Sequence, residues 1–216
     1  MAIYGILKDS AVDATTGNPP TSGLSNSDVL AAFAVPMSVT SKQPVSSSDT
    51  LSLKRVTSVP SAQRWEIETN IEPTNNSSAL FVHSLLHGKT EKIKIRMPQI
   101  YLGRDYVSTS ATLINDVAAG SSSITGNVSA LLVGEFIKFS NHDKVYVVTN
   151  SASPSNSTQI FTILPKLTTR VEGSTKIHRG DNVTLTAYYD TDVVHGMKYI
   201  DGILMDMGNV KFVEAL

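Results

Sequence analysis

The chain has 216 residues, with 18 basic and 19 acidic side chains, no cysteine and a formal net charge of −1. This balance gives no global field to hold nucleic acid or an anionic membrane, and the lack of cysteine excludes disulfides and thiolate metal sites. The length suits one large β domain or two small ones. No stretch approaches the roughly 20 apolar residues of a membrane span, and we expect no signal peptide or membrane anchor.

The chain opens with a polar segment. Residues 8–28 are rich in Gly, Pro, Ser and Thr, so we predict a flexible N-terminal arm over residues 1–30. The first strand is predicted over residues 33–40, where apolar side chains alternate with polar ones, and a second near residues 51–59.

The clearest strand pattern covers residues 64–71. Trp65, Ile67 and Ile71 fall on one face and polar side chains on the other. This period of two is typical of a half-buried antiparallel strand. Trp65 is the only tryptophan, and its place on the apolar face predicts a core anchor, not a residue that stacks on a ligand.

One helix of about three turns is predicted next. Asn76 or Ser77 can cap its start, and Gly88 is placed to end it. Its broad apolar face consists of Leu80, Phe81, Leu85 and Leu86. A strand over residues 92–97 follows, in which basic and apolar side chains alternate until Pro98.

The composition changes after Tyr106, where Ser, Thr, Ala and Gly become frequent. Residues 134–139 and 144–149 predict a β-hairpin around an Asn-His-Asp turn. Further strands are predicted over residues 159–164, ended by Pro165, and over residues 181–189. We therefore assign residues 108–184 to an inserted small all-β module rich in hairpins.

The predicted fold class is mainly β, within an α+β arrangement. The main domain, an antiparallel β-sandwich or barrel with one short helix, takes residues 31–107 and 185–216. The inserted small all-β domain interrupts it.

Patterns that could carry chemistry are incomplete. His83 and His87 have the spacing of a two-histidine metal site, but the HExxH glutamate is missing, so a polar helix face is the favoured interpretation. His142 and Asp143 could belong to a Ser-His-Asp set, but no nucleophile elbow occurs and a turn is favoured. The acids Asp190, Asp192, Asp201 and Asp206 do not continue as a calcium loop. We therefore predict no catalytic residues, no cofactor and no metal.

A basic run follows the predicted helix. It consists of Lys89, Lys92, Lys94 and Arg96. The last three are predicted to project from the outer face of the strand, either as a solvated or aggregation-protecting edge or as a patch that meets an acidic neighbouring subunit.

Two segments resemble tail proteins of bacteriophages. In the first, an apolar-Pro-Met strand is followed by a Leu-x-x-Lys-Arg segment, then Gln-Arg-Trp-Glu, a helix and a Gly-Lys turn. The matching positions are Pro36, Met37, Leu53, Lys54, Arg55, Gln63, Arg64, Trp65, Glu66, Gly88 and Lys89.

The second segment resembles a Gly-Asp-x-Ile-x-Phe-x-x-His-x-Lys-Val-Tyr hairpin of the same proteins, with Glu135 where they have Asp. Its matching positions include Gly134, Phe136, His142, Lys144 and Tyr146, followed by an Ile-x-Pro-x-Leu pattern around Pro165. Residues 208–216 are similar to the ending of these proteins. The resemblance covers most of the chain from about residue 33 onward.

The resemblance implies a distal tail or baseplate-hub structural protein. Such a protein forms a ring, expected here to be a homohexamer, between the tail tube protein and the baseplate hub and peripheral baseplate or fibre proteins. It is made in the bacterial cytoplasm and located in the virion at the distal end of the tail. The alternative is a tail-fibre or other virion-surface β module that binds host glycan or receptor, and an enzyme such as a glycan hydrolase is a third and weaker hypothesis.

Overall fold

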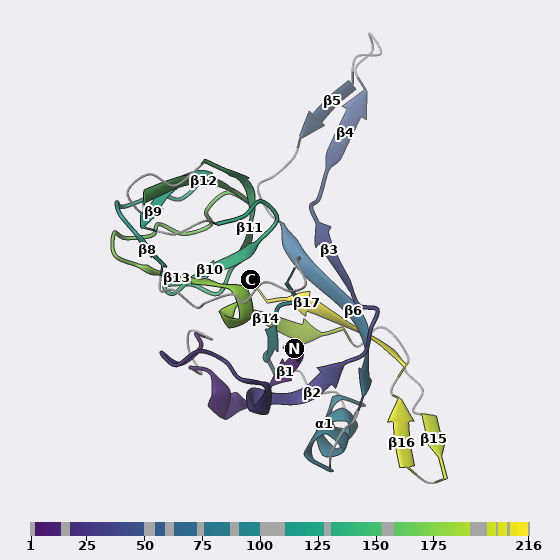
Figure 1. The fold of residues 1–216 in the computed structure, drawn as a ribbon. Helices are drawn as coiled ribbons and strands as arrows, with labels where there is room; N and C mark the ends of the chain where they lie inside the picture. The colour runs from purple at the N-terminus through teal and green to yellow at the C-terminus, as the bar shows by residue number, and fades with distance from the viewer. Residues whose placement is uncertain are drawn as a thin grey trace.

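The structure is a computed structural model. It describes residues 3–13, 18–49, 55–58, 63–72, 76–86, 91–99, 111–127, 131–152, 158–190, 198–201, 203–206 and 208–215. These residues form two closed antiparallel β-barrels with one α-helix and two projecting two-stranded ribbons (Figure 1). The predicted mainly β class is confirmed, and the main domain is a barrel rather than a sandwich.

The first barrel joins strands from both ends of the chain. In sheet order its strands are β17 (Asn209–Glu214), β14 (Thr184–Tyr189), β7 (Ile93–Arg96), β1 (Gly5–Leu7), β2 (Val29–Phe33) and β6 (Arg64–Glu72). Pairing of β17 with β6, from Asn209 opposite Asn70 to Val213 opposite Glu66, closes the circle.

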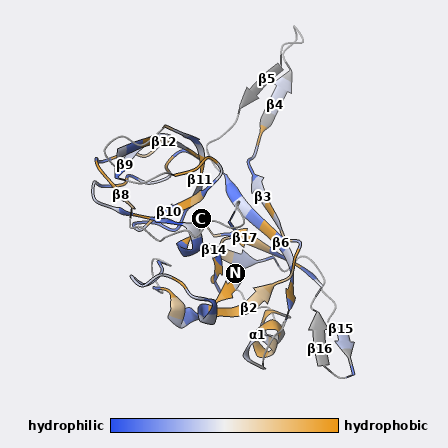
Figure 2. Cartoon of the chain, viewed as in Figure 1, coloured by the Kyte–Doolittle hydropathy of each residue, from blue (hydrophilic) through white to orange (hydrophobic). Residues whose placement is uncertain are grey.

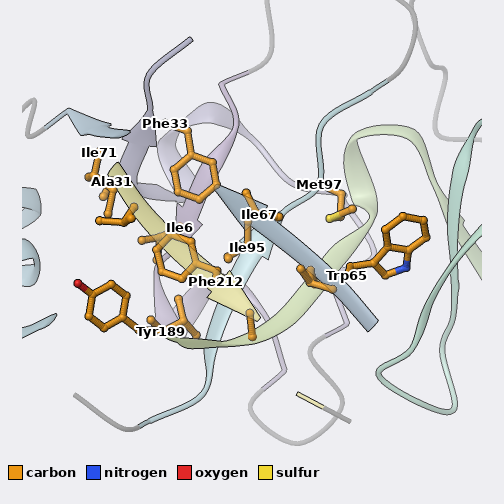
Figure 3. Packing of buried hydrophobic residues seen from close by; sticks show 14 of the residues in the cluster. Ile6, Ala31, Phe33, Trp65, Ile67, Ile71, Ile95, Met97, Tyr189 and Phe212 are labelled. Atoms are coloured by element: carbon orange, nitrogen blue, oxygen red, sulfur yellow. The ribbon is translucent and has the colours of Figure 1, made fainter. Parts of the chain in front are cut away.

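The core of this barrel follows the alternation of β6. Trp65, Ile67 and Ile71 point inward, as predicted, and are buried. Phe33 and Phe212 stack within the cluster, with their ring centroids 5.7 Å apart. In Figure 3 the Trp65 ring lies at the far end of this cluster.

The prediction of a flexible arm over residues 1–30 is wrong for its first strand. β1 lies between β2 and β7, with Gly5 opposite both Ala32 and Arg96. A Cβ atom at Gly5 would lie 2.1 Å from the carbonyl oxygen of Ala31, so this strand needs a residue without a side chain. The segment continues through two 3-10 turns, η1 (Asp9–Ala11) and η2 (Asn26–Asp28).

The helix α1 spans Asn76–Leu86, which agrees with the predicted start at Asn76 or Ser77. It contacts β2. Val82 and Leu85 are buried in the core of the first barrel, while Leu80 faces outward. Gly88, the predicted end of the helix, lies outside the described residues. In the part of the chain that the structure describes, no helix has the length and apolar character needed to cross a membrane.

A ribbon projects from the first barrel. After β2, the chain continues as β3 (Ser38–Lys42), which pairs with the part of β6 that extends past β2. Beyond it, β4 (Ser46–Asp49) pairs with β5 (Arg55–Ser58), and Figure 1 shows this pair standing clear of both barrels. Figure 2 shows hydrophilic residues at the start of β6, where β3 lies beside it. A second ribbon pairs β15 (Lys198–Ile200) with β16 (Ile203–Asp206).

The second barrel is inserted between β7 and β14. In order around the closed barrel its strands are β10 (Phe136–Phe139), β11 (Val145–Ser151), β12 (Thr158–Leu164), β9 (Ser123–Asn127), β8 (Ala111–Leu113) and β13 (Lys176–Arg179). The predicted hairpin is confirmed as β10–β11, with Phe136 opposite Val147. A 3-10 turn, η3 (Gly180–Asn182), leads back into β14.

Candidate functional site at the junction of the two barrels

The two segments that carry the resemblance meet where the barrels touch. Trp65 of β6 packs edge to face on Phe136 of β10, with ring centroids 5.2 Å apart. The indole Nε1–H of Trp65 donates a hydrogen bond of 2.9 Å to the carbonyl oxygen of Val145. The Phe136 and Val145 side chains are buried in the core cluster of the first barrel, although both belong to strands of the second. Trp65 is therefore a core anchor, and it joins the two barrels.

A buried ion pair lies beside this contact. The carboxylate of Glu214, on β17, accepts hydrogen bonds from the backbone N–H groups of Trp65 at 3.0 Å and Val145 at 3.3 Å, and from Nζ of Lys144. Lys144 also donates to the carbonyl oxygen of Gln63 at 2.6 Å. Burial raises the pKa of Glu214 and lowers that of Lys144, although each charge is stabilised by the other. Removing either partner would leave an uncompensated charge.

A second polar bridge crosses the junction through Asp143. Its carboxylate lies 3.0 Å from Nζ of Lys138 and 3.5 Å from Nζ of Lys94. Lys138 and Lys94 also donate to the hydroxyls of Thr184 and Thr186, at 3.2 Å and 2.8 Å. Burial lowers the pKa of the Lys138 ammonium. Asp143 and Lys138 belong to the second barrel and the other three residues to the first, so the bridge fixes one barrel against the other.

The predicted inter-subunit patch is therefore wrong for two of its members. Lys94 and Arg96 are buried, because the second barrel and the N-terminal segment cover the outer face of β7. Arg96 donates to the carbonyl oxygens of Ile3 and Asp181 at 3.2 Å and 3.0 Å, and ties the N-terminal segment to the loop before β14. Lys92 is exposed, and Lys89 lies outside the described residues.

His142 supports the hairpin turn. Its Nε2 and Nδ1 atoms lie 2.7 Å from the Tyr146 hydroxyl and 2.8 Å from Oδ1 of Asn141, and its ring stacks on Phe139 with centroids 5.9 Å apart. The Tyr146 hydroxyl also lies 3.0 Å from that of Thr168. Burial lowers the pKa of His142 to about 4. Both ring nitrogens thus form hydrogen bonds within the β10–β11 hairpin, which agrees with the interpretation of His142 as a turn residue.

Three further predicted residues lie in the second barrel or next to it. Gly134 has φ of 89° in the turn before β10, a left-handed conformation that favours glycine. Pro165 is buried after β12. Glu135, the departure from the resemblance, forms a buried two-point pair with Arg179, at 2.9 Å and 3.0 Å.

Other predicted residues lie along the ribbon or at its base. Pro36 and Met37 occupy the bend between β2 and β3, and Met37 packs against the first core. Arg64 begins β6 and lies 2.9 Å from the buried carboxylate of Glu66. Arg55 begins β5, whereas Lys54 lies outside the described residues.

A cleft of about 730 Å³ opens at the junction. It is lined by Gln63 and Ala215 from the first barrel and by Ala119, Gly120, His142, Asp143, Lys144, Lys166, Leu167, Thr168 and Thr169 from the second. Sequence reasoning missed this cleft, and it missed Glu214. Each lining residue looks ordinary alone, and no motif connects positions so far apart in the chain.

Among the described residues, no group of three or more His, Cys, Asp or Glu side chains is arranged to hold an ion. His87 and the side chain of His83 lie outside this description.

No family model and no curated protein matches the chain. Its function must therefore be inferred from its own residues and contacts.

Proposed function

We propose that the chain is a non-enzymatic structural subunit of a phage tail tip or baseplate. In this proposal it forms a ring, a homohexamer, that joins the tail tube to the hub and to peripheral baseplate or fibre proteins. The resemblance of residues 33 onward motivates the assignment. The observation that carries it is the projecting ribbon of the first barrel, because a compact soluble domain gains no stability from strands that stand clear of its core.

The ribbon has the features of an assembly surface. Among the described residues β3 pairs only with β6, so its outer edge is open. An open edge can pair with another chain, and natural monomers usually protect such edges. Val35 and Val45 flank β3 and are 87% and 60% exposed. Apolar side chains next to an open edge favour a protein partner over water.

A head-to-tail ring needs two different complementary surfaces on each subunit. The ribbon supplies one, and the outer wall of the first barrel, where α1 leaves Leu80 exposed, can supply the other. The second barrel is held rigidly by the Trp65 contact and the two polar bridges. It can therefore present a fixed surface to a different neighbour outside the ring.

The test measures the oligomeric mass of the wild-type chain and of a variant that carries a new charge on the ribbon. Light scattering coupled to size exclusion, with negative-stain images, should show rings for the full chain. Val45→Asp places a charge on the ribbon and should shift the chain to monomers without unfolding it, because Val45 is 60% exposed.

Ile160→Asp is the matched control, because it also charges an exposed apolar residue, here 55% exposed on β12 of the second barrel, away from both proposed ring surfaces. Leu80→Asp, at a residue 63% exposed on α1, tests the second surface separately. Loss of rings in Val45→Asp with rings retained in Ile160→Asp supports ribbon-mediated assembly, and loss of rings in Leu80→Asp assigns the second surface to α1. A wild-type chain that stays monomeric at micromolar concentration, and is absent from rings in assembled particles, would overturn the proposal.

A further inference from the structure

We propose that the open edge of β3 pairs with β15 of a second copy of the chain, so that neighbouring subunits share one β-sheet. This inference rests on the proposed ring, and it names the two strands that meet there. Pairing between strands uses main-chain hydrogen bonds, with side chains around the edge supplying further contacts.

The backbone groups of β3 at Val39 and Ser41 point to its open edge. Val39 lies opposite Ile67, and Ser41 lies opposite Trp65. The N–H group of Trp65 donates to the Glu214 carboxylate on β17, so it points away from β3. Along an antiparallel pair, residues alternate between those bonded to the partner strand and those that point outward. The N–H and C=O groups of Ser41, and of Val39 two residues earlier, therefore face outward.

A second hydrogen bond gives the same alternation. The carbonyl oxygen of Asn70 accepts from the N–H group of Ala34, on the side of β6 where β2 and β3 lie. Asn70 and Trp65 are an odd number of positions apart, and β6 pairs with β3 and β17 without a register shift. Their backbone groups must therefore point to opposite sides of β6, as both hydrogen bonds indicate.

Few of the described strands have an open edge. Both barrels are closed, so the open edges belong to β3 and to the ribbons β4–β5 and β15–β16. The contact in a head-to-tail ring joins two different surfaces of the subunit. Because β4 and β5 continue the projection that β3 begins, the ribbon β15–β16 is the remaining partner for β3.

The two ribbons leave the first barrel at opposite ends of β6. β3 ends at Lys42, opposite Arg64 at the start of β6, and the chain continues into β4. β16 is followed by β17, which begins opposite Asn70, about 20 Å further along β6. The helix α1 follows β6 and starts at this same end, so the second ribbon belongs to the ring surface that includes Leu80. Figure 1 shows the two ribbons projecting in different directions, as a head-to-tail contact requires.

The side chains around the two edges are compatible. Val35 and Val45 flank β3 and Tyr199 lies on β15, and all three are exposed, so apolar contacts can cover the paired strands. Lys42, which is 58% exposed, and Asp201, exposed in the turn of the second ribbon, carry opposite charges. β16 contacts β6, which leaves β15 as the outer strand of its ribbon.

Substitutions at Ser41 test the main-chain pairing. Proline is tolerated on an edge strand where the N–H group faces outward, but it removes the donor that a neighbouring strand would use. Ser41→Pro should therefore fold, as checked by circular dichroism, and raise the dissociation constant of the ring contact at least about tenfold in light scattering. Ser41→Ala is the matched control, because it also removes the hydroxyl that accepts from Gln63 but keeps the backbone N–H group.

A cross-link identifies the partner strand, and the wild-type chain has no cysteine to interfere. The double variant Ser41→Cys/Tyr199→Cys, treated with a short bismaleimide, should give a ladder of covalent oligomers on a denaturing gel. Ser41→Cys/Ser123→Cys is the matched control, because Ser123 is exposed on β9 of the second barrel. It should give no ladder.

Loss of rings in Ser41→Pro but not in Ser41→Ala, together with the Ser41–Tyr199 ladder, supports the pairing of β3 with β15. Rings that persist in Ser41→Pro overturn the main-chain pairing, and absence of the ladder overturns the assignment of β15, while the ring stands in both cases. If Ser41→Pro does not fold, the cross-link decides. A wild-type chain that forms no rings would instead overturn the proposed function, and this inference with it.

Discussion

The second barrel is built from one contiguous stretch, residues 111–179, whereas the first barrel joins strands from residue 5 to residue 214. Their cores differ in the same way. Every residue in the core cluster of the second barrel belongs to that stretch, but the first core includes Phe136 and Val145 from the second barrel. The second barrel can therefore complete its own core, while the first depends on its neighbour to cover Trp65.

The largest expected effect tests this dependence at the buried ion pair. Lys144→Met should destabilise the chain by about 3–5 kcal/mol, because it leaves the Glu214 carboxylate buried without its cation. Urea unfolding should show the loss, and the double variant Lys144→Met/Glu214→Gln should recover part of it, because a neutral amide oxygen still accepts from the Trp65 and Val145 N–H groups. If the double variant is no more stable than the single one, the loss does not come from an unpaired Glu214 charge.

The indole hydrogen bond should matter less. Trp65→Phe keeps an aromatic ring on β6 but leaves the Val145 carbonyl without its donor, at a cost of about 1–3 kcal/mol. Single-phase urea unfolding, followed by circular dichroism and by hydrogen exchange of second-barrel amides, would show that both barrels lose stability together. A loss of stability confined to the first barrel would show that only the first core depends on the contact between the barrels.

A fall in pH should lower the free energy of unfolding mainly through two histidines of the second barrel. Burial holds the pKa of His142 and of His178 at about 4, below the ordinary value of 6.5. The unfolded chain therefore binds protons more readily, so this stability is present above pH 6.5 and is lost as the pH falls from 6.5 to 4. Glu214 opposes the trend, because burial raises its pKa.

Urea midpoints measured at steps between pH 7 and pH 4 would test this trend. His178→Leu should give a shallower decline, since Nε2 of His178 is buried and accepts or donates no hydrogen bond within the described residues. An unchanged slope would show that other groups dominate the acid response.

The smallest expected effect distinguishes two lysines that lie two positions apart in the chain. Lys92→Ala should change the free energy of unfolding by no more than about 0.5 kcal/mol, because Lys92 is exposed. Lys94→Ala should cost about 1–3 kcal/mol, because it removes hydrogen-bond and charge partners from Thr186 and Asp143. Equal effects in thermal or urea unfolding would contradict the burial of β7 on both faces.

Regular alternation made parts of the fold predictable. The apolar face of β6, the helix α1 and the β10–β11 hairpin each carry a local pattern of the right period. The strand β1 does not, because three residues are too few to show a period and its place depends on a close approach of Gly5 to Ala31. The closure of both barrels also depends on long-range pairings that no local pattern encodes.

Lys94 and Arg96 show why the site was harder to predict. Basic residues that alternate with isoleucine normally face solvent, and only the presence of a second barrel and an N-terminal segment on that face makes them internal. Glu214 likewise ends an ordinary strand in the sequence. Its role depends on Lys144, which lies 70 positions earlier in the chain.

The insertion point of the second barrel has a consequence for synthesis. Arg96 and Thr184, which border the insertion, are cross-strand partners in the first barrel. While the ribosome is still producing the chain, residues 111–179 are complete long before β17 emerges to pair with β6. The second barrel is thus the first that can close during synthesis. The strands β1 and β2 cannot become part of a closed barrel until β17 has been made.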